Sequence, residues 1–223
     1  MIPASLGYCW TMAEIYAFPA GVSAMTPHMQ QSASDNSDRG VPVPDVVLRA
    51  VESVRSMTLR EGVSYREIAV PSSMADYGIG VQLDIEDVSR CTIGGWLLLL
   101  YRERMQEEWD SHWRCVAFAS VTSDERRVDD LTASLTWDWL ERMMTGVQEE
   151  TLGGTVSLNQ NTSFGTLARY STQERSHGCE LRVSWTPVLG SGGCPDAAMQ
   201  IDGWARFLQT LDDNDELEEP NID

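Results

Sequence analysis

The stretch IGVQLDIE, residues 79–86, alternates apolar and polar side chains, and the fold prediction starts from it. Its odd positions are apolar and its even positions are not, and this period of two predicts a half-buried strand with one face in water. Residues 93–101 and 115–121 carry apolar side chains on both faces, so we expect them in the middle of a sheet or beneath helices. Turn residues between these segments indicate an antiparallel meander.

Amphipathic segments on both sides of these strands predict helices. Residues 44–60, 136–149 and 195–211 each carry an apolar stripe at helical spacing. Residues 155–164 and 179–186 have the pattern of two further strands. The predicted order is helix, three strands, helix, two strands, helix. We therefore expect an α+β domain with an antiparallel-dominated sheet of about five strands and three helices packed on it, similar to the secretion-chaperone-like fold.

The two ends of the chain differ in composition from this domain. Residues 1–42 include a long polar stretch with almost nothing to bury, so we expect a disordered N-terminal extension. The sequence leaves open whether translation starts at Met1 or further along, at Met25 or Met29. Residues 43–211 are the predicted single domain, and the strongly acidic residues 212–223 are predicted to be a disordered tail.

The charge and composition exclude several function classes. The 223 residues include 16 basic and 34 acidic side chains, a formal net charge of −18, and every basic residue is arginine. Lysine chemistry is therefore excluded, and direct nucleic-acid or membrane-surface binding is not expected. No basic residue precedes Arg39 and no apolar run is long enough to span a membrane, so no secretory signal or membrane anchor is predicted. The five scattered cysteines favour a reducing, cytoplasmic location.

Side chains that could carry chemistry are few, and none forms a recognisable catalytic pattern. His112 and Cys115, with a second histidine and cysteine at His177 and Cys179, have the right ligand types for zinc but no common zinc spacing. The acidic turn at residues 107–110 offers paired carboxylates beside a tryptophan, although an acidic turn before a strand is the more common meaning. We predict no catalytic residue, no metal and no cofactor.

Eight tryptophans are many for this length. Indole rings fill protein cores, ligand pockets and protein interfaces, so each tryptophan needs to be placed. Trp137, Trp185 and Trp204 fall on predicted apolar faces and are expected in the core. Trp109 stands in the acidic turn, and Trp139 lies off the main stripe of its helix. These two tryptophans define a candidate interaction surface, together with Asp110 next to Trp109 and Met143 one helical turn after Trp139. Its predicted residues are Trp109, Asp110, Trp139 and Met143.

Spaced tryptophan, glycine and proline positions carry a resemblance to a known family. The segments are EIAVP at 67–71, EEWD at 107–110, TWDWL at 136–140, GGTVS at 153–157, SFGTLA at 163–168 and LRVSWTP at 181–187. Together they resemble the actinobacterial family called domain of unknown function 3000, over about residues 43–211. Members are often encoded near a ribonuclease-D-like exonuclease, so the resemblance implies a link to RNA metabolism.

These observations lead to a non-enzymatic cytoplasmic interaction or chaperone-like module as the first hypothesis. The acidic field of the chain would favour a basic protein partner. A strand with one wet face and tryptophans outside the core are also compatible with a homodimer. The second hypothesis is an accessory factor in RNA metabolism that acts beside a nuclease. The third is a small-molecule hydrolase that uses the carboxylates of residues 107–110.

Overall fold

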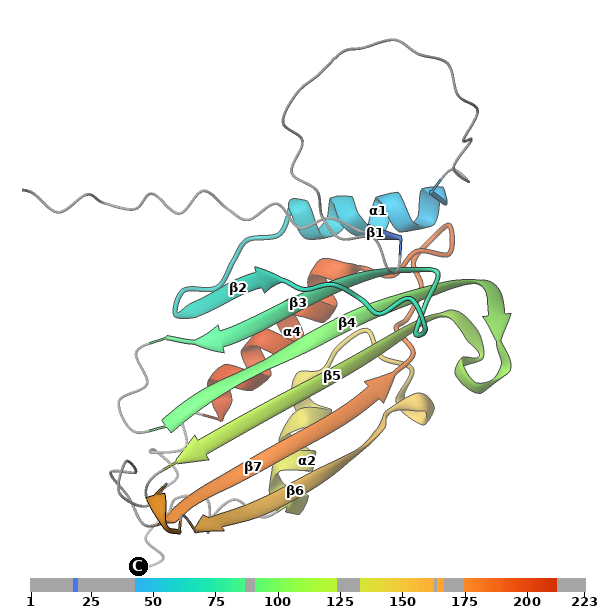
Figure 1. Ribbon diagram of the computed structural model, residues 1–223. Helices are drawn as coiled ribbons and strands as arrows, with labels where there is room; N and C mark the ends of the chain where they lie inside the picture. Colours follow the sequence, from blue (N-terminus) through green and yellow to red (C-terminus); the bar gives the residue numbers. More distant parts are fainter. Residues whose placement is uncertain are drawn as a thin grey trace, which may run out of the picture.

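The computed structural model describes residues 18–19, 43–86, 91–123, 133–162, 164–166 and 175–211 (Figure 1). The predicted extension and acidic tail therefore lie outside the described residues, except for the two residues of β1. The described helices are α1 (Asp45–Arg55), α2 (Ala133–Met143) and α4 (Ala197–Thr210), with short 3-10 turns η1 (Glu107–Trp109) and η3 (Glu149–Thr151). The described strands are β1 (Phe18–Pro19), β2 (Val63–Glu67), β3 (Tyr77–Ile85), β4 (Cys91–Gln106), β5 (Ser111–Ser123), β6 (Gly153–Thr162) and β7 (Arg175–Trp185).

The strands form one antiparallel sheet in the order β1-β3-β4-β5-β7-β6, in which β2 also pairs with β3. Strands β2 and β1 share one edge of β3, because β2 lies beside residues 81–85 and β1 beside residues 77–78. The predicted α+β class is confirmed, with six principal strands in place of about five. The additional strand β2 has only five residues, so its alternation is too short to stand out in the sequence.

The helices form a layer on one face of this sheet. Figure 1 shows α2 and α4 behind the strands, and α1 packs against α4. The inward side chains of the strands and the apolar stripes of the helices bury each other in one large core. Trp185 and Trp204 are fully buried in it, as predicted, with ring centroids 6.2 Å apart. Trp137 is half-buried, and its indole N–H donates to Glu141.

The predicted bounds of the first two helices are wrong, and local backbone features explain where each one ends. The first helix ends at Arg55 and not at residue 60. Directly after it, the Ser56 hydroxyl donates to backbone carbonyls of the preceding turn. The second spans residues 133–143 in place of 136–149, and Gly146 follows with a left-handed φ of 66°. The start of the last helix is as predicted, because the Asp196 carboxylate caps it by accepting from the Met199 N–H.

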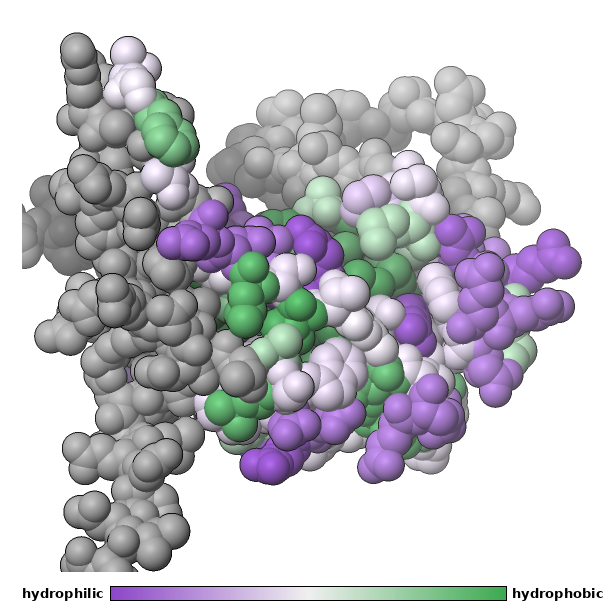
Figure 2. Space-filling model, turned by 90° about the horizontal axis from the view of Figure 1, so that it is seen from below, coloured by the Kyte–Doolittle hydropathy of each residue, from purple (hydrophilic) through white to green (hydrophobic). Residues whose placement is uncertain are grey.

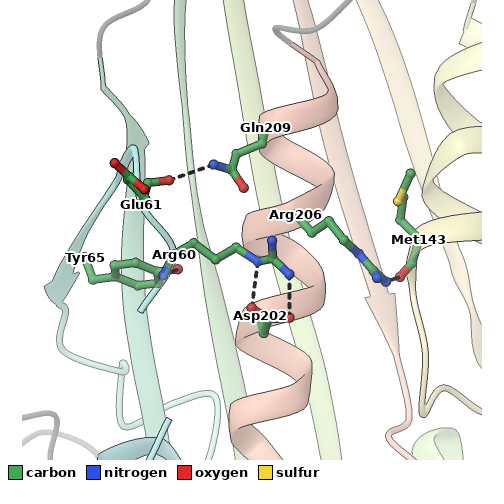
Figure 3. A network of polar contacts seen from close by, with 7 residues as sticks. All are labelled: Arg60, Glu61, Tyr65, Met143, Asp202, Arg206 and Gln209. Carbon is green, nitrogen blue, oxygen red and sulfur yellow. Dashed lines mark hydrogen bonds and ion pairs between the residues drawn. The ribbon is translucent and has the colours of Figure 1, made fainter. Parts of the chain in front are cut away.

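Polar contacts fasten α4 to its neighbours on both sides (Figure 3). The Arg60 guanidinium donates two hydrogen bonds to Asp202, at 2.6 and 2.9 Å, and this partner raises the pKa of Arg60. In the last turn of α4, Gln209 donates to the Glu61 carbonyl, and one turn earlier Arg206 donates to the Met143 carbonyl at the end of α2. These bonds hold the helix layer in register with the β2 side of the sheet.

The opposite face of the sheet, which we call the outer face, is crossed by the connection between β2 and β3. Residues 68–76 pack there on Leu98 and Leu100 and form a second, smaller apolar cluster. Gly80 makes this close approach possible, because a Cβ at that position would collide with the Ile68 carbonyl. Arg102 fastens the connection by donating to two of its backbone carbonyls.

Candidate binding face

The outer face carries an apolar patch beside the β2–β3 connection. Its members are Trp96 on β4, Val116 and Phe118 on β5, and Trp109 from η1, and we call these four residues the outer patch. All four side chains are half-buried, whereas the inward neighbours on the same strands are fully buried. Within the described part of the chain, no helix lies over this face (Figure 1). The patch therefore combines aromatic area with access from solvent.

The strand register places the two central aromatic residues in a row that crosses the sheet. Arg66 pairs with Gln82, Gln82 with Trp96, Trp96 with Phe118, and Phe118 with Arg182. We call these five residues the transverse row. The Trp96 and Phe118 rings stack with centroids 5.8 Å apart, and the Arg182 guanidinium lies 5.6 Å from the Phe118 centroid. An arginine thus lies at each end of an aromatic centre.

The arginines of the outer face are held mainly by neutral groups. Arg114 donates to the hydroxyls of Ser184 and Thr186, and burial lowers its pKa. Arg66 donates to the amide oxygen of Gln82. Arg182 differs, because it forms an ion pair with Glu180 at 2.7 Å.

The strands of the outer face carry more arginine than the composition of the whole chain would suggest. The outward strand positions that the structure describes carry three arginines and two carboxylates. These are Arg66, Arg114 and Arg182, and Asp84 and Glu180. Arg102 reaches the same face and lies 6.0 Å above the Trp109 ring. At these strand positions arginine outnumbers carboxylate, although acidic residues are about twice as common as arginine in the chain. The exposed Glu107, Glu108 and Asp110 lie beyond them, on and beside η1.

A shallow hollow of about 290 Å³ lies next to the row, between β5, β7 and the start of β6. Its lining includes Phe118, Arg182, Ser184 and the glycines at 153 and 154. No heavy atom lies near the position of a Cβ on Gly153, so this end of the face is low and open. Figure 2 views the molecule from the β6 side and shows neutral and apolar residues in the middle with hydrophilic residues at the rim.

The structure separates the four residues predicted as an interaction surface. Trp109 packs in the outer patch, and its backbone carbonyl accepts from the Thr186 hydroxyl at 2.8 Å. Asp110 is exposed at the β4–β5 turn with a left-handed φ of 47°. Trp139 and Met143 lie on α2, half-buried against the main core. The two pairs are therefore on opposite sides of the sheet and do not form one surface.

Sequence reasoning missed Trp96, Val116, Phe118 and Arg182 as members of a face. Strands with apolar residues on both sides were expected in the middle of a sheet or beneath helices, and they do lie in the middle. Their outward side is not beneath a described helix. The signal was present in the bulky aromatic residues at alternate positions, but an aromatic residue at a buried position gives the same pattern.

The candidate chemical groups are placed as follows. Cys115 and Cys179 point into the core, and burial raises the pKa of both thiols. The His112 ring stacks on Tyr101, and its Nδ1 donates to the Arg102 carbonyl, while the side chain of His177 lies outside the described residues. In the described ranges, no three His, Cys, Asp or Glu side chains are grouped as metal ligands would be.

The carboxylates proposed for hydrolysis lie at the surface. Glu107 and Glu108 are exposed on η1, next to Asp110. A different carboxylate, Glu67 on β2, has its pKa raised to about 7 because it is partly desolvated. It lies at the margin of the helix-covered face, paired with Val81, far along the sheet register from η1.

The fold defines an α+β protein with an antiparallel sheet, helices on one face and an open arginine-rich aromatic face. The chain matches the family described as Protein of unknown function (DUF3000) over residues 43–212, and it belongs to that family. The predicted resemblance is thereby confirmed. Comparison with curated proteins and with solved structures found no match, so the likeness to secretion chaperones stays a prediction. No described helix has the length and apolar character needed to cross a bilayer.

Proposed function

We propose that this protein is a non-enzymatic interaction module of the cytoplasm that binds a partner protein through the outer patch. The observation that carries the proposal is the half-buried aromatic set on a sheet face that no described helix covers. Tryptophan and phenylalanine supply much contact area at low entropy cost, and tryptophan and arginine dominate the binding energy of many interfaces. Among the described side chains, Cys115, Cys179 and Cys194 are free thiols, which accords with a reducing location.

The geometry gives less support to the hydrolase hypothesis. General acid–base chemistry needs carboxylates in a site that excludes water and shifts their pKa values. Glu107 and Glu108 are instead exposed on a turn whose ordinary role is to reverse the chain between β4 and β5. The role beside a nuclease remains compatible with the proposal, because a nuclease would be one form of the partner protein.

The experiment is an affinity purification of the tagged full-length chain from its own host, followed by mass spectrometry. Wild type is compared with Phe118→Ala, which removes the centre of the outer patch, and with Leu48→Ala. Leu48 is 53% exposed on α1 in the helix layer, so it is a matched apolar truncation away from the face. Circular dichroism confirms that all three proteins are folded before they are compared.

We expect a partner in near-equal amount with wild type and with Leu48→Ala, and a reduction of at least about tenfold with Phe118→Ala. Truncation of a hot-spot residue costs about 2 kcal/mol or more, and about 1.4 kcal/mol already corresponds to tenfold. Equal recovery with all three proteins would place the partner elsewhere and reject the outer patch. Absence of any partner with folded wild type would reject the interaction module itself.

A further inference from the structure

We propose, resting on the function above, that the partner presents an acidic segment to the transverse row. An apolar side chain of that segment lies on the stacked rings of Trp96 and Phe118, and its carboxylates meet the arginines on either side. The whole-chain charge predicted a basic partner, but binding depends on the field within about 8 Å at physiological ionic strength. In the row, the Arg66 guanidinium is bonded to the neutral amide of Gln82, and the Arg182 guanidinium shares Glu180 with solvent.

The first argument is that several of these arginines lack a carboxylate partner among the described residues. A chain with 34 acidic and 16 basic residues has many carboxylates available for pairing. Arg60 shows this pairing on the other side of the molecule, with two hydrogen bonds to Asp202. Arg66 and Arg114 instead donate to an amide and to two hydroxyls. Their positive charge is left for an external anion to match.

The second argument is the partial burial of Arg114. Burial disfavours a charged group and lowers the pKa of this guanidinium, and neutral hydroxyls compensate the charge only in part. A carboxylate that enters from solvent would restore the lost solvation with a charge-assisted hydrogen bond. Arg114 lies beside the transverse row, four residues from Phe118 along β5 with Val116 of the outer patch between them.

The third argument is the length of the transverse row. Neighbouring strands are about 4.8 Å apart, so the four strand spacings from Arg66 to Arg182 span roughly 19 Å. An extended peptide advances about 3.3 Å per residue, so a segment of about six residues covers the row. The geometry therefore specifies an apolar residue near the centre of the segment and an acidic residue toward each end.

Single-stranded nucleic acid is the competing ligand, because aromatic rings flanked by arginine also stack bases and hold phosphates. A peptide is favoured by the charge beyond the row. A nucleic acid longer than the row has a phosphate on every nucleotide, and the chain's net charge of −18 would repel the phosphates that lie beyond the row. A peptide limits its acidic residues to the positions that face arginine.

The experiment selects a displayed library of random peptides on the immobilised full chain at low salt, and measures oligouridine binding in parallel. Selected peptides are then measured against wild type, the double variant Arg66→Gln/Arg182→Gln, Phe118→Ala, and Arg142→Gln. Arg142 is exposed on α2 in the helix layer, so its substitution is a control for the loss of an arginine charge elsewhere.

We expect selected peptides to carry Asp or Glu on both sides of an aromatic or aliphatic residue. Their affinity should fall at least about tenfold in the double variant and in Phe118→Ala, change less than about twofold in Arg142→Gln, and decrease as salt is added.

Basic or uncharged peptides that still require Phe118 would overturn the acidic-ligand proposal while the proposed function stands. Oligouridine that binds more tightly than every selected peptide, with loss in the double variant, would replace the peptide by nucleic acid. Selection of no peptide by folded wild type, together with no oligouridine binding, would overturn this proposal. The proposed function would still be judged separately, by the recovery of a partner from the host.

Discussion

The inner and outer faces of β4 and β5 are built from the same two strands but have different environments. Leu97, Leu99 and Cys115 face the helices and are essentially inaccessible to solvent. Trp96, next to Leu97, and Phe118, next to the buried Ala117, are half-buried on a face without a described helix. Side chains on alternating positions of a strand therefore serve two purposes here. The inner face stabilises the fold, and the outer face keeps aromatic area available for binding.

The polar groups of the two faces differ in the same way. On the inner side, the Trp185 indole N–H donates to Gln200 at 2.7 Å, and the Gln200 amide donates in turn to the Gly146 carbonyl. Both side chains are fully buried, so this short network is satisfied within the protein. On the outer side, the positively charged Arg114 guanidinium donates its hydrogen bonds to two hydroxyl groups. The inner side also holds a buried polar atom without a partner among the described residues, the Trp204 indole nitrogen. The two faces therefore differ in the kind of polar group they hold, a neutral amide and indole inside and a charged arginine held by hydroxyls outside.

The largest expected effect is on the inner face, from Trp185→Ala. The substitution opens a cavity against Trp204 and leaves Gln200 without its indole donor. We expect a loss of about 3–5 kcal/mol in the free energy of unfolding. Urea titration followed by circular dichroism measures it. A loss below about 1 kcal/mol would mean that the inner face is not the main source of stability.

A smaller loss is expected from Gly80→Ala, which tests how tightly residues 68–76 cross the outer face. The added Cβ collides with the Ile68 carbonyl, a backbone atom that moves only with the connection. We expect destabilisation of about 2 kcal/mol. Gly153→Ala is the control, since nothing lies near its Cβ position, and it should change stability by less than about 0.5 kcal/mol. Equal effects of the two variants would contradict the packing described for this connection.

Phe118→Ala should separate binding from stability. The ring is half-buried on the outer face, so we expect only about 1 kcal/mol of destabilisation, from the apolar area that becomes exposed. Thermal unfolding of the variant and of Trp185→Ala in parallel gives the comparison. If Phe118→Ala destabilised the chain as much as Trp185→Ala, the outer patch would be part of the core and not an available surface.

The smallest effect is expected at Glu67, at the margin of the inner face. Its pKa is raised to about 7 by partial desolvation, so the folded state holds the proton more tightly than the unfolded state does. The stabilisation linked to that proton is complete below about pH 4.5 and is lost as the pH rises through 7.

Glu67→Gln should therefore raise stability by about 0.5 kcal/mol at pH 8, a value reduced for solvent screening, and leave it almost unchanged at pH 4. Urea unfolding of both proteins at the two pH values measures this. A gain of the same size at both pH values would show that desolvation of the carboxylate is not the cause.

Much of the fold was predictable because local patterns and tertiary packing agree. The strand predicted at residues 79–86 and the start of the last helix near residue 195 appear in the structure as predicted. The expected wet face of that strand is found only at Gln82 and Asp84, because residues 68–76 cover its first half. The prediction of β2 failed because five residues are too few for a period to emerge. The predicted end of α2 at residue 149 was too late, because Gly146 follows the helix with a left-handed backbone.

The candidate face was predictable only in part. Trp109 was selected from its acidic surroundings, and it packs in the outer patch. Trp139 and Met143 were selected from their place on a helix, and they pack against the main core on the other side of the sheet. Trp96, Phe118 and Arg182 come from three strands, and only their register brings them into one row.

The sequence by itself determined the α+β class, the family and most of the elements, because hydrophobic periodicity and turn residues act over a few positions along the chain. The tertiary structure alone decided which side of each central strand the helices cover. It also decided that arginines and aromatic residues from distant segments meet on the other side. Strand pairing and layer packing join residues far apart in the chain, and no local pattern specifies which face is left open.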